Sequence, residues 1–266
     1  MSYTDRTVTC VDCSVEFIHS EADQEFYAEK GEVVLDRSAL EALGDKVEIR
    51  ETRIAQADGR PYGVVERLRV VVPDAPVASL DAPLPTEVVQ KWVLPAVFER
   101  LRTGRGEFLA ELRPAYPLCV RFGGIDYDHD ADAIGKLDDF IRHAQRILTT
   151  YGGNLLHLTL GDKGAYLYTV FGSPVAHEDD AARAAAAALE LRDLASVTAA
   201  TDIQIGIAYG RLRSGTYGHA QRQAFTCLGD AGDLSARLMG KAPPGEIYVP
   251  EPVRRDVLAR GQQRQS

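Results

Sequence analysis

Two cysteines near the start of the chain are spaced for chemistry that needs paired thiolates. Cys10 and Cys13 form a Cys-x-x-Cys pair, which is half of the ligand set of a tetrahedral structural zinc site. The nearby His19 does not complete a familiar four-ligand spacing. The pair therefore indicates either a degenerate knuckle with two free thiols, or zinc shared with a second chain or a distant ligand. A thioredoxin-like redox role is disfavoured, because no helix in a βαβ context follows the pair.

Four aspartates alternate in the middle of the chain, and carboxylates are the usual ligands of divalent cations. They are Asp126, Asp128, Asp130 and Asp132. A calcium-binding loop needs a glycine at its sixth position, where this chain has Ala133. The run therefore favours a solvated acidic loop leading into a helix N-terminus over a calcium site.

The composition excludes several classes of partner. The 266 residues carry 30 Lys and Arg against 39 Asp and Glu, a formal net charge of −9. No basic excess is available for nucleic acid or an anionic membrane surface. No apolar run approaches the length of a transmembrane helix and no signal pattern opens the chain, so the expected location is the cytoplasm. Cys119 and Cys227 lie in apolar runs, which predicts buried thiols.

Several short units are expected before the main domain. Residues 1–33 form one acidic unit around the Cys-x-x-Cys pair. Residues 34–72 form a strand-rich segment that opens with a short helix. Residues 73–115 begin with a proline-rich linker and continue as helices, with Thr86 as an N-cap and Pro95 as a kink.

The main domain is predicted over residues 116–255. The expected element order is β-α-β-β-α-β-(β)-α-β, with a first helix whose apolar stripe includes Ile134, Leu137 and Ile141. This order predicts an α+β fold, the ferredoxin-like split βαβ, with helices on one face of a mostly antiparallel sheet. Residues 256–266 are expected to be disordered.

The main domain resembles the catalytic domain of class III adenylate/guanylate cyclases, over about half of the chain. The motifs that carry the resemblance are YGGNLLHLTLGDKG, YTVFGSPVAHEDDAARAAAAAL, IGIAYGRLRSGTYG and FTCLGDAGDLSARLMGKAPPGEIYV, in this order. The form that these motifs take in this chain resembles the second, C2-like cyclase domain of large bacterial tandem proteins. Residues 34–72 then resemble the tail of a preceding cyclase domain. Residues 1–33 resemble the first half of a short bacterial zinc ribbon whose second Cys-x-x-Cys is absent.

The resemblance implies a reaction and a divided site. ATP or GTP would be cyclised by attack of the ribose 3′-oxygen on the α-phosphorus, releasing pyrophosphate, with two Mg or Mn ions stabilising the charge. In this family two aspartates bind the ions. A Lys with an Asp or Thr contacts the purine, and an Asn with an Arg holds ribose and phosphate. The site lies at a dimer interface, with the metal residues from one domain and the Asn and Arg from the other.

The metal positions carry over only in part. Gly124 stands where the family has its first metal aspartate, and Asp162 in the LGDKG motif matches the second. One alternative is that Asp126 replaces the lost carboxylate, by a two-residue shift that keeps side-chain parity. Another is that Asp162 is a turn aspartate bonded to local backbone N–H groups.

The base- and phosphate-binding positions also carry over only in part. Leu158 stands at the purine-contacting lysine, so that contact is lost, whereas Thr226 matches the second purine contact. Asp233 stands at the asparagine, and Arg237 matches the arginine one helical turn later. The alternatives are a plain strand residue at Thr226 and a surface ion pair at Arg237.

These positions predict a degenerate C2-like half that pairs with a metal-competent cyclase domain. The chain alone is expected to be a weak or inactive cyclase, because losing a ligand of a two-metal site costs several kcal/mol of transition-state stabilisation. The alternatives are a self-sufficient cyclase with a rearranged metal site, and a non-catalytic interaction or nucleotide-sensing protein.

Overall fold

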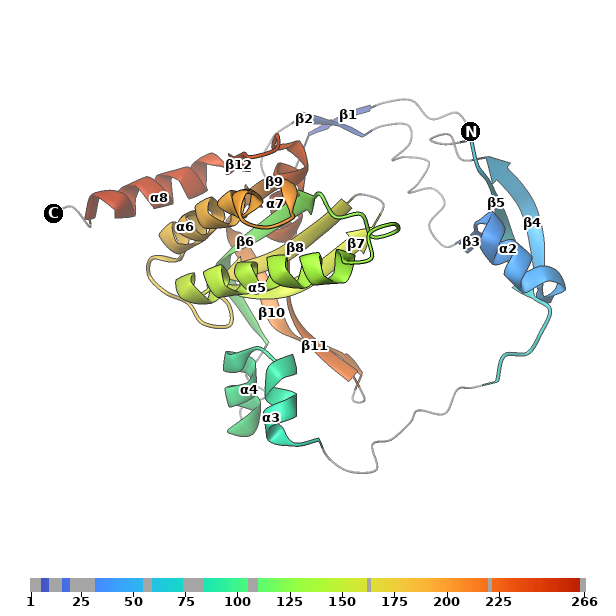
Figure 1. Ribbon diagram of the computed structural model, residues 1–266, viewed down its shortest axis with the longest axis horizontal. Helices are drawn as coiled ribbons and strands as arrows, with labels where there is room; N and C mark the ends of the chain where they lie inside the picture. Colours follow the sequence, from blue (N-terminus) through green and yellow to red (C-terminus); the bar gives the residue numbers. More distant parts are fainter. Residues whose placement is uncertain are drawn as a thin grey trace. The chain divides into compact units, whose positions relative to one another are not determined.

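The computed structural model describes residues 6–9, 16–19, 32–54, 59–73, 84–104, 110–161, 164–219 and 222–263. Contacts between residues divide the chain into two units, Met1–Asp81 and Ala82–Ser266. In Figure 1 the first unit is coloured from blue to cyan and the second from green to red.

The first unit contains two small sheets. One is a hairpin of β1 (Arg6–Thr9) and β2 (Glu16–His19), which pair antiparallel. The other has the strand order β3 (Val34–Leu35), β5 (Pro61–Leu68), β4 (Val47–Ile54). Helix α2 (Arg37–Leu43) follows β3, and the Asp36 carboxylate caps it by accepting the Ala39 N–H at 2.7 Å.

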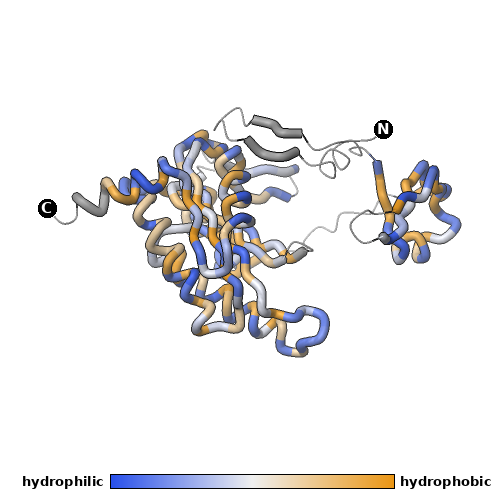
Figure 2. Tube along the Cα trace, turned by 90° about the horizontal axis from the view of Figure 1, so that it is seen from above, coloured by the Kyte–Doolittle hydropathy of each residue, from blue (hydrophilic) through white to orange (hydrophobic). Residues whose placement is uncertain are grey.

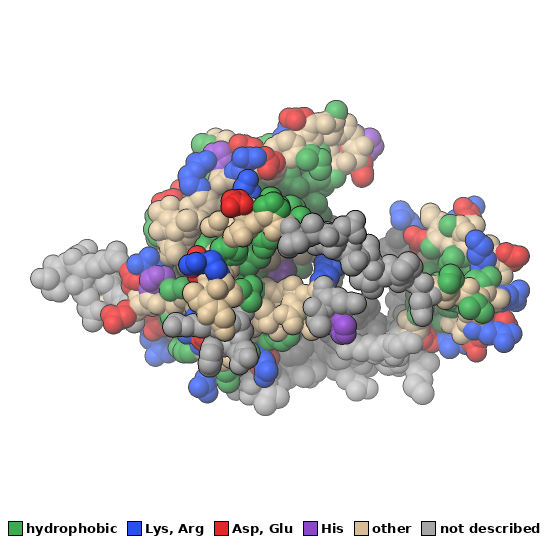
Figure 3. Space-filling view, turned by 90° about the horizontal axis from the view of Figure 1, so that it is seen from below, with side chains coloured by type: hydrophobic (Ala, Val, Ile, Leu, Met, Phe, Trp, Pro, Cys, Tyr) green, Lys and Arg blue, Asp and Glu red, His purple; other side chains and the backbone are tan. Residues whose placement is uncertain are grey.

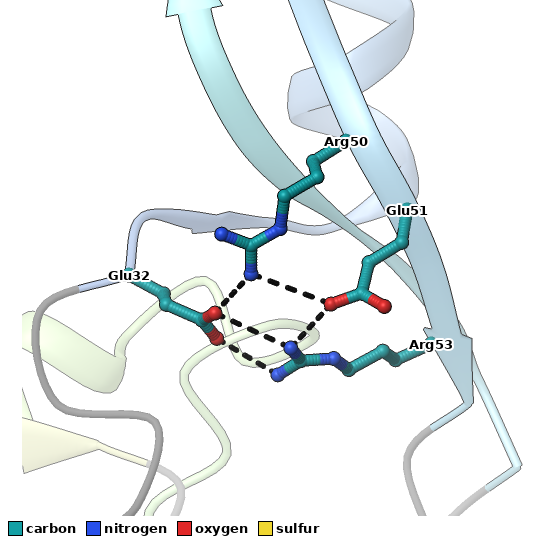
Figure 4. Close-up of polar contacts among 4 residues, drawn as sticks. All are labelled: Glu32, Arg50, Glu51 and Arg53. Carbon is teal, nitrogen blue, oxygen red and sulfur yellow. Dashed lines mark hydrogen bonds and ion pairs between the residues drawn. The ribbon is translucent and has the colours of Figure 1, made fainter.

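Charged side chains gather at one end of β4 (Figure 4). Arg53 Nη1 lies 2.8 Å from Glu32 Oε2, and both Arg50 and Arg53 also contact Glu51. Hydrogen bonds from Arg53 and Arg50 lower the pKa of the Glu32 carboxyl below its ordinary value. Because these groups lie at the surface, two of them exposed and two partly buried, the cluster adds little to the stability of this unit.

The second unit opens with two short helices. They are α3 (Thr86–Val89), continued by a 3-10 turn η2 (Gln90–Trp92), and α4 (Pro95–Arg102). The predicted helices are present, but Thr86 is the first residue of α3 and makes no side-chain cap. Pro95 starts α4, where its missing N–H costs nothing, instead of kinking a longer helix. The prediction that helices continue to residue 115 is wrong, because the residues from Glu111 onward form a strand.

A seven-stranded sheet forms the centre of the second unit. Its order is β11-β10-β6-β8-β7, with β9 also paired to β6 and β12 paired to β9. All these pairs are antiparallel except the short β9–β12 pair. The strands are β6 (Glu111–Gly123), β7 (Asn154–Gly161), β8 (Gly164–Phe171), β9 (Thr201–Ile207), β10 (Gly210–His219), β11 (Arg222–Leu228) and β12 (Ile247–Tyr248).

Helices cover both faces of this sheet (Figure 1). On one face α5 (Ala133–Tyr151), α6 (Asp180–Asp193) and α8 (Glu251–Gln263) contribute side chains to the main core. On the other face α7 (Asp230–Lys241) covers a smaller apolar cluster. The predicted α+β fold is confirmed, whereas the expectation that the helices share one face is wrong for α7. Figure 2 shows both hydrophobic and hydrophilic stretches along these elements.

Helix α7 lies directly against strand β9. A Cβ on Gly206 of β9 would overlap the carbonyl oxygen of Ser235 and the backbone nitrogen of Met239. Glycine is therefore required here, because no side chain fits between strand and helix. This close approach fixes the height of α7 above the sheet.

The disordered tail expected over residues 256–266 is wrong as far as Gln263, because α8 occupies this segment. Val253 is fully buried in the main core, and the Tyr116 hydroxyl donates to Asp256 at 2.9 Å. These contacts, which the polar sequence of the segment does not reveal, hold the helix on the domain. Among the described helices, none is both long and apolar enough to span a membrane.

Candidate active site

A pocket of about 240 Å³ lies on the α7 face of the sheet. Strands β6, β7 and β8 form its floor, and the end of β11 and the first two turns of α7 form its wall. Figure 3 shows hydrophobic side chains exposed among scattered charged ones on one face of this unit. The residues that line the pocket are Cys119, His157, Thr159, Tyr166, Tyr168, Cys227, Leu228, Gly229, Gly232, Asp233 and Ala236.

A hydrogen bond at the edge of this pocket joins two strands that are distant in sequence. Nε2 of His157 on β7 lies 2.8 Å from Oγ1 of Thr226 on β11. Thr226 is only 9% exposed, whereas His157 is exposed. The sequence predicted that Thr226 lies in the site, but it assigned no role to His157.

A β-bulge in β7 brings His157 to this position. The pairing of β7 with β8 shifts between Leu155 and His157. Leu156 packs on the α7-face cluster and His157 lines the pocket on that same face, so two successive side chains point the same way. Leu158 consequently falls on the opposite face, where it is 40% exposed and does not line the pocket.

Burial governs the titration of the pocket floor. It raises the pKa of the Cys119 thiol to about 11, with the charge of Asp233 adding to the effect and the hydrogen bond with Ser235 opposing it. Burial also raises the pKa of the Tyr168 hydroxyl, which donates to the Cys227 carbonyl at 2.9 Å. The Cys119 thiol and the Tyr168 hydroxyl are therefore uncharged near neutral pH. Both Cys119 and Cys227 are buried, as predicted.

The end of strand β6 leaves no room for a side chain at Gly124. This residue has φ +85°, and a Cβ would lie 2.7 Å from both the Ala199 carbonyl oxygen and Thr201 Oγ1. The first of these atoms is backbone and cannot move aside cheaply. An aspartate at this position would require a local change of the chain path.

The acidic loop after β6 uses its carboxylates on itself. The Asp126 carboxylate accepts the backbone N–H groups of Asp128 and His129 at 3.0 and 3.1 Å. Asp130 accepts the N–H of Asp132 at 2.9 Å and pairs with Lys136. Both aspartates thus form local turns that lead into α5, which is the solvated loop that the sequence favoured.

Asp233 and Arg237 lie one turn apart on α7, and both are exposed. Asp233 lies at the rim of the pocket and close enough to raise the pKa values of the floor groups. Asp162, in the turn between β7 and β8, lies outside the described residues, as do Cys10 and Cys13. Within the described part of the chain, no three His, Cys, Asp or Glu residues gather closely enough to hold a metal ion.

Comparison with curated proteins finds relatives of the second unit. Human adenylate cyclase type 10 is 27% identical over 154 residues, which cover 57% of this chain and 10% of the human protein. The rabbit adenylate cyclase type 10 is 29% identical over 156 residues, with the same coverage of each chain. The match therefore spans about a tenth of the length of these relatives.

Solved structures show the same fold. The adenylyl cyclase CyaB from P. aeruginosa superposes with a TM-score of 0.51 at 19% identity, covering 56% of this chain and 83% of that one. The catalytic core of a rhodopsin-guanylyl cyclase, solved with ATPalphaS, gives 0.51 at 18% identity over 57% and 86%. The chain contains a class III adenylate/guanylate cyclase homology domain. Its fold is that of nucleotidyl cyclase domains, and its sequence is similar to that of adenylate cyclase type 10.

The N-terminal segment matches a different family. A model described as a probable treble clef domain matches residues 4–39. This match contains the Cys-x-x-Cys pair, in the segment that the sequence analysis compared with half of a zinc ribbon.

Within the cyclase homology domain, the two groups of family positions differ in what they can do. The first metal position is closed at Gly124, and Asp126 is engaged in its own turn. The described residues of this half therefore do not fit a two-metal site, and no metal-dependent step can be assigned to them. At the purine-contact position, Thr226 is buried and bonded to His157, which lines the pocket.

Proposed function

We propose that this domain is the base- and phosphate-binding half of a composite nucleotidyl cyclase site. A second, metal-competent cyclase domain would complete the site. The observation that carries the proposal is Gly124, where the backbone excludes the side chain that a metal ligand needs. Retention of Thr226 beside a pocket, and of Arg237 on α7, supports the assignment of the other half to this chain.

The reaction would convert ATP or GTP into a cyclic nucleotide and pyrophosphate. Magnesium or manganese, held by the partner domain, would stabilise charge on the attacking and leaving oxygens. On this chain, Thr226 would contact the base and Arg237 would place its guanidinium near the phosphates. Asp233 adds a negative charge beside the triphosphate, so this half is weaker than one with an amide at that position.

The relatives support both the reaction class and the pairing. The curated relatives are named adenylate cyclases. One structure of similar fold, with a TM-score of 0.50 at 16% identity, is described as a non-canonical dimeric guanylyl cyclase domain of a RhoGC fusion protein, so domains of this fold do pair. A dimer is what a site divided between two domains requires.

The treble clef match supports a separate zinc site in the N-terminal segment. Cys10 and Cys13 would supply two of its four ligands, and the remaining ligands would come from a second chain or a distant residue. Metal analysis of the purified chain, compared with a Cys10→Ser variant, tests this assignment. The expected result is one zinc per chain if the other ligands come from a distant residue of the same chain, or one zinc per two chains if two chains share it, and no zinc in the variant.

A turnover assay on the purified chain tests the assignment of the cyclase half. ATP and GTP are supplied separately with excess manganese, and cyclic AMP and cyclic GMP are detected by mass spectrometry. No product above the blank is expected. Turnover that disappears on Asp162→Ala would instead establish a self-sufficient cyclase with a rearranged metal site.

A further inference from the structure

We propose that a second cavity, between the α3–α4 helices and the sheet, binds a small organic carboxylate with a saturated hydrocarbon tail. This cavity borders the candidate cyclase pocket at His157, which lines both. Its ligand is not the nucleotide, so this site stands or falls independently of the proposed function.

The cavity is the larger of the two, with a volume of about 700 Å³. Three parts of the second unit enclose it: the segment from η2 through α4, the last turns of α5 with the start of β7, and strands β10 and β11. On α5 the lining residues Gln145, Leu148 and Thr149 have the i, i+3, i+4 spacing of one helix face. The volume falls within the range of small-molecule sites, which is roughly 300–1,000 Å³.

Most of the cavity wall is aliphatic. Val97 and Leu148 are buried, although both line the cavity. The aliphatic side chains that line it include Leu94, Val97, Leu101, Leu148, Leu155 and Leu156. Such a wall gains from burial against hydrocarbon without fixing its direction, so a flexible saturated tail fits it well.

The charge around the cavity favours an anion. Lys91 lines it, whereas no Asp or Glu does so among the described residues, in a chain with 39 acidic residues against 30 Lys and Arg. Within the described part of the chain Lys91 forms no ion pair. One unpaired cation matches a single negative charge, so a carboxylate suits this site better than a phosphate, which carries more charge.

Two polar side chains on α5 can bind the head group of such a ligand. Gln145 and Thr149 line the cavity, and neither side chain makes a hydrogen bond to another described residue. A glutamine amide and a threonine hydroxyl both donate to carboxylate oxygens. Both residues are exposed, so a carboxylate would replace water at donors that are already accessible.

Trp92 marks the mouth of the cavity. It is the single tryptophan of the chain, it lines the cavity, and it is 85% exposed. A bound hydrocarbon tail would shield part of this indole from water. Its fluorescence should then shift to shorter wavelength, which reports binding without a label.

Titration of the full chain with three eight-carbon compounds tests the proposal: octanoate, 1-octanol and octylammonium. They have similar tails and differ in the charge of the head group. Octanoate should bind about fivefold more tightly than 1-octanol, the effect of one partly exposed ion pair, and octylammonium should bind most weakly. Calorimetry measures the affinities, and the emission of Trp92 reports whether the ligand lies beside it.

Two variants and a matched control locate the ligand. Lys91→Met removes the charge and keeps an apolar side chain, so octanoate affinity should fall about fivefold while 1-octanol affinity stays unchanged. Thr149→Phe places a phenyl ring in the cavity from an exposed helix position, and all three compounds should bind at least tenfold more weakly. Lys241→Met, at the end of α7 and outside the cavity, should change nothing. Thermal unfolding of each variant separates loss of the site from loss of the fold.

Each contrary result overturns a defined part of the proposal. Octanoate that binds no better than octylammonium, or that binds Lys91→Met as tightly as wild type, would refute a carboxylate ligand. Binding that survives Thr149→Phe would place the ligand outside this cavity. A wild-type chain that binds none of the compounds would refute the site, and sedimentation would then show whether a second copy of the chain fills it. None of these results bears on cyclase turnover, so the proposed function is tested separately.

Discussion

At the scale of single residues, Gly124 does most to decide what this domain can do. Its sequence position predicted only that a metal ligand is missing. The structure adds that the ligand cannot be restored by substitution alone, since φ is +85° and the Ala199 carbonyl lies 2.7 Å from where a Cβ would be. The loss of the carboxylate is therefore built into the backbone of the strand end.

A Gly124→Asp variant tests this reasoning. We expect it to lower the free energy of unfolding by about 1–3 kcal/mol, from the unfavourable dihedral and the backbone overlap. We also expect no manganese-dependent cyclase activity in the variant. Chemical denaturation and the turnover assay check both points. A stable variant that gains turnover would mean that only the side chain, and not the backbone, was missing.

The buried thiol of Cys119 predicts how stability depends on alkaline pH. Its pKa is raised from 9.0 to about 11 in the folded chain, so above pH 9 the unfolded chain loses this proton first. The stability that the thiol contributes is therefore complete below pH 9 and is lost as the pH rises toward 11, by on the order of 2 kcal/mol. Urea unfolding at pH 7.5 and pH 10 should show a smaller loss in Cys119→Ala than in wild type. Equal losses in the two proteins would contradict the assignment.

At the scale of elements, the sequence predicted the parts of the domain better than their placement. The motif order was sufficient for the α+β fold, because each strand and helix is marked by its own periodicity and turn residues. It was harder to predict which face of the sheet each helix covers and which of its residues pack there. The stripe on α5 included Leu137 and Ile141, which do pack on the core, but also Ile134, which is 74% exposed. A stripe of apolar residues predicts the buried face of a helix, but it does not show how far the neighbouring elements extend over that face.

The candidate site, too, could be predicted only in part from the sequence. Motif matching predicted Thr226, because the family pattern around it is intact. It could not predict His157, since one extra residue in a bulge reverses which side chains face the pocket and leaves no mark in the sequence pattern. Similarly, the burial of Val253 that holds α8 on the domain depends on tertiary packing alone.

Gly206→Ala tests the contact between strand β9 and helix α7. The added Cβ would overlap backbone atoms of α7, so we expect a loss of about 3 kcal/mol or more in the free energy of unfolding. Gly240→Ala is the matched control, because a Cβ there meets nothing within 4 Å. On an exposed helix position this change should be neutral or stabilise the domain by about 0.5–1 kcal/mol. Equal effects of the two substitutions in chemical denaturation would refute the close packing of α7.

At the scale of the whole molecule, the account makes this chain one partner in a divided site. On the proposed function, the cyclase homology domain would offer a pocket for the base and an arginine for phosphate, while Gly124 closes its first metal position. Such a domain would need a partner that supplies the metal ligands, so its activity has to be measured together with that partner.

The most direct measurement is complementation with a tester cyclase domain. The tester keeps both metal aspartates and its purine-contact lysine, but its own asparagine and arginine are replaced, so it is inactive by itself. Equimolar mixing with this chain should produce cyclic nucleotide from ATP or GTP, and Arg237→Ala in this chain should reduce the yield at least tenfold. Asp233→Asn should raise it. A mixture that stays inactive although the two domains associate would contradict the claim that this chain supplies the base- and phosphate-binding half.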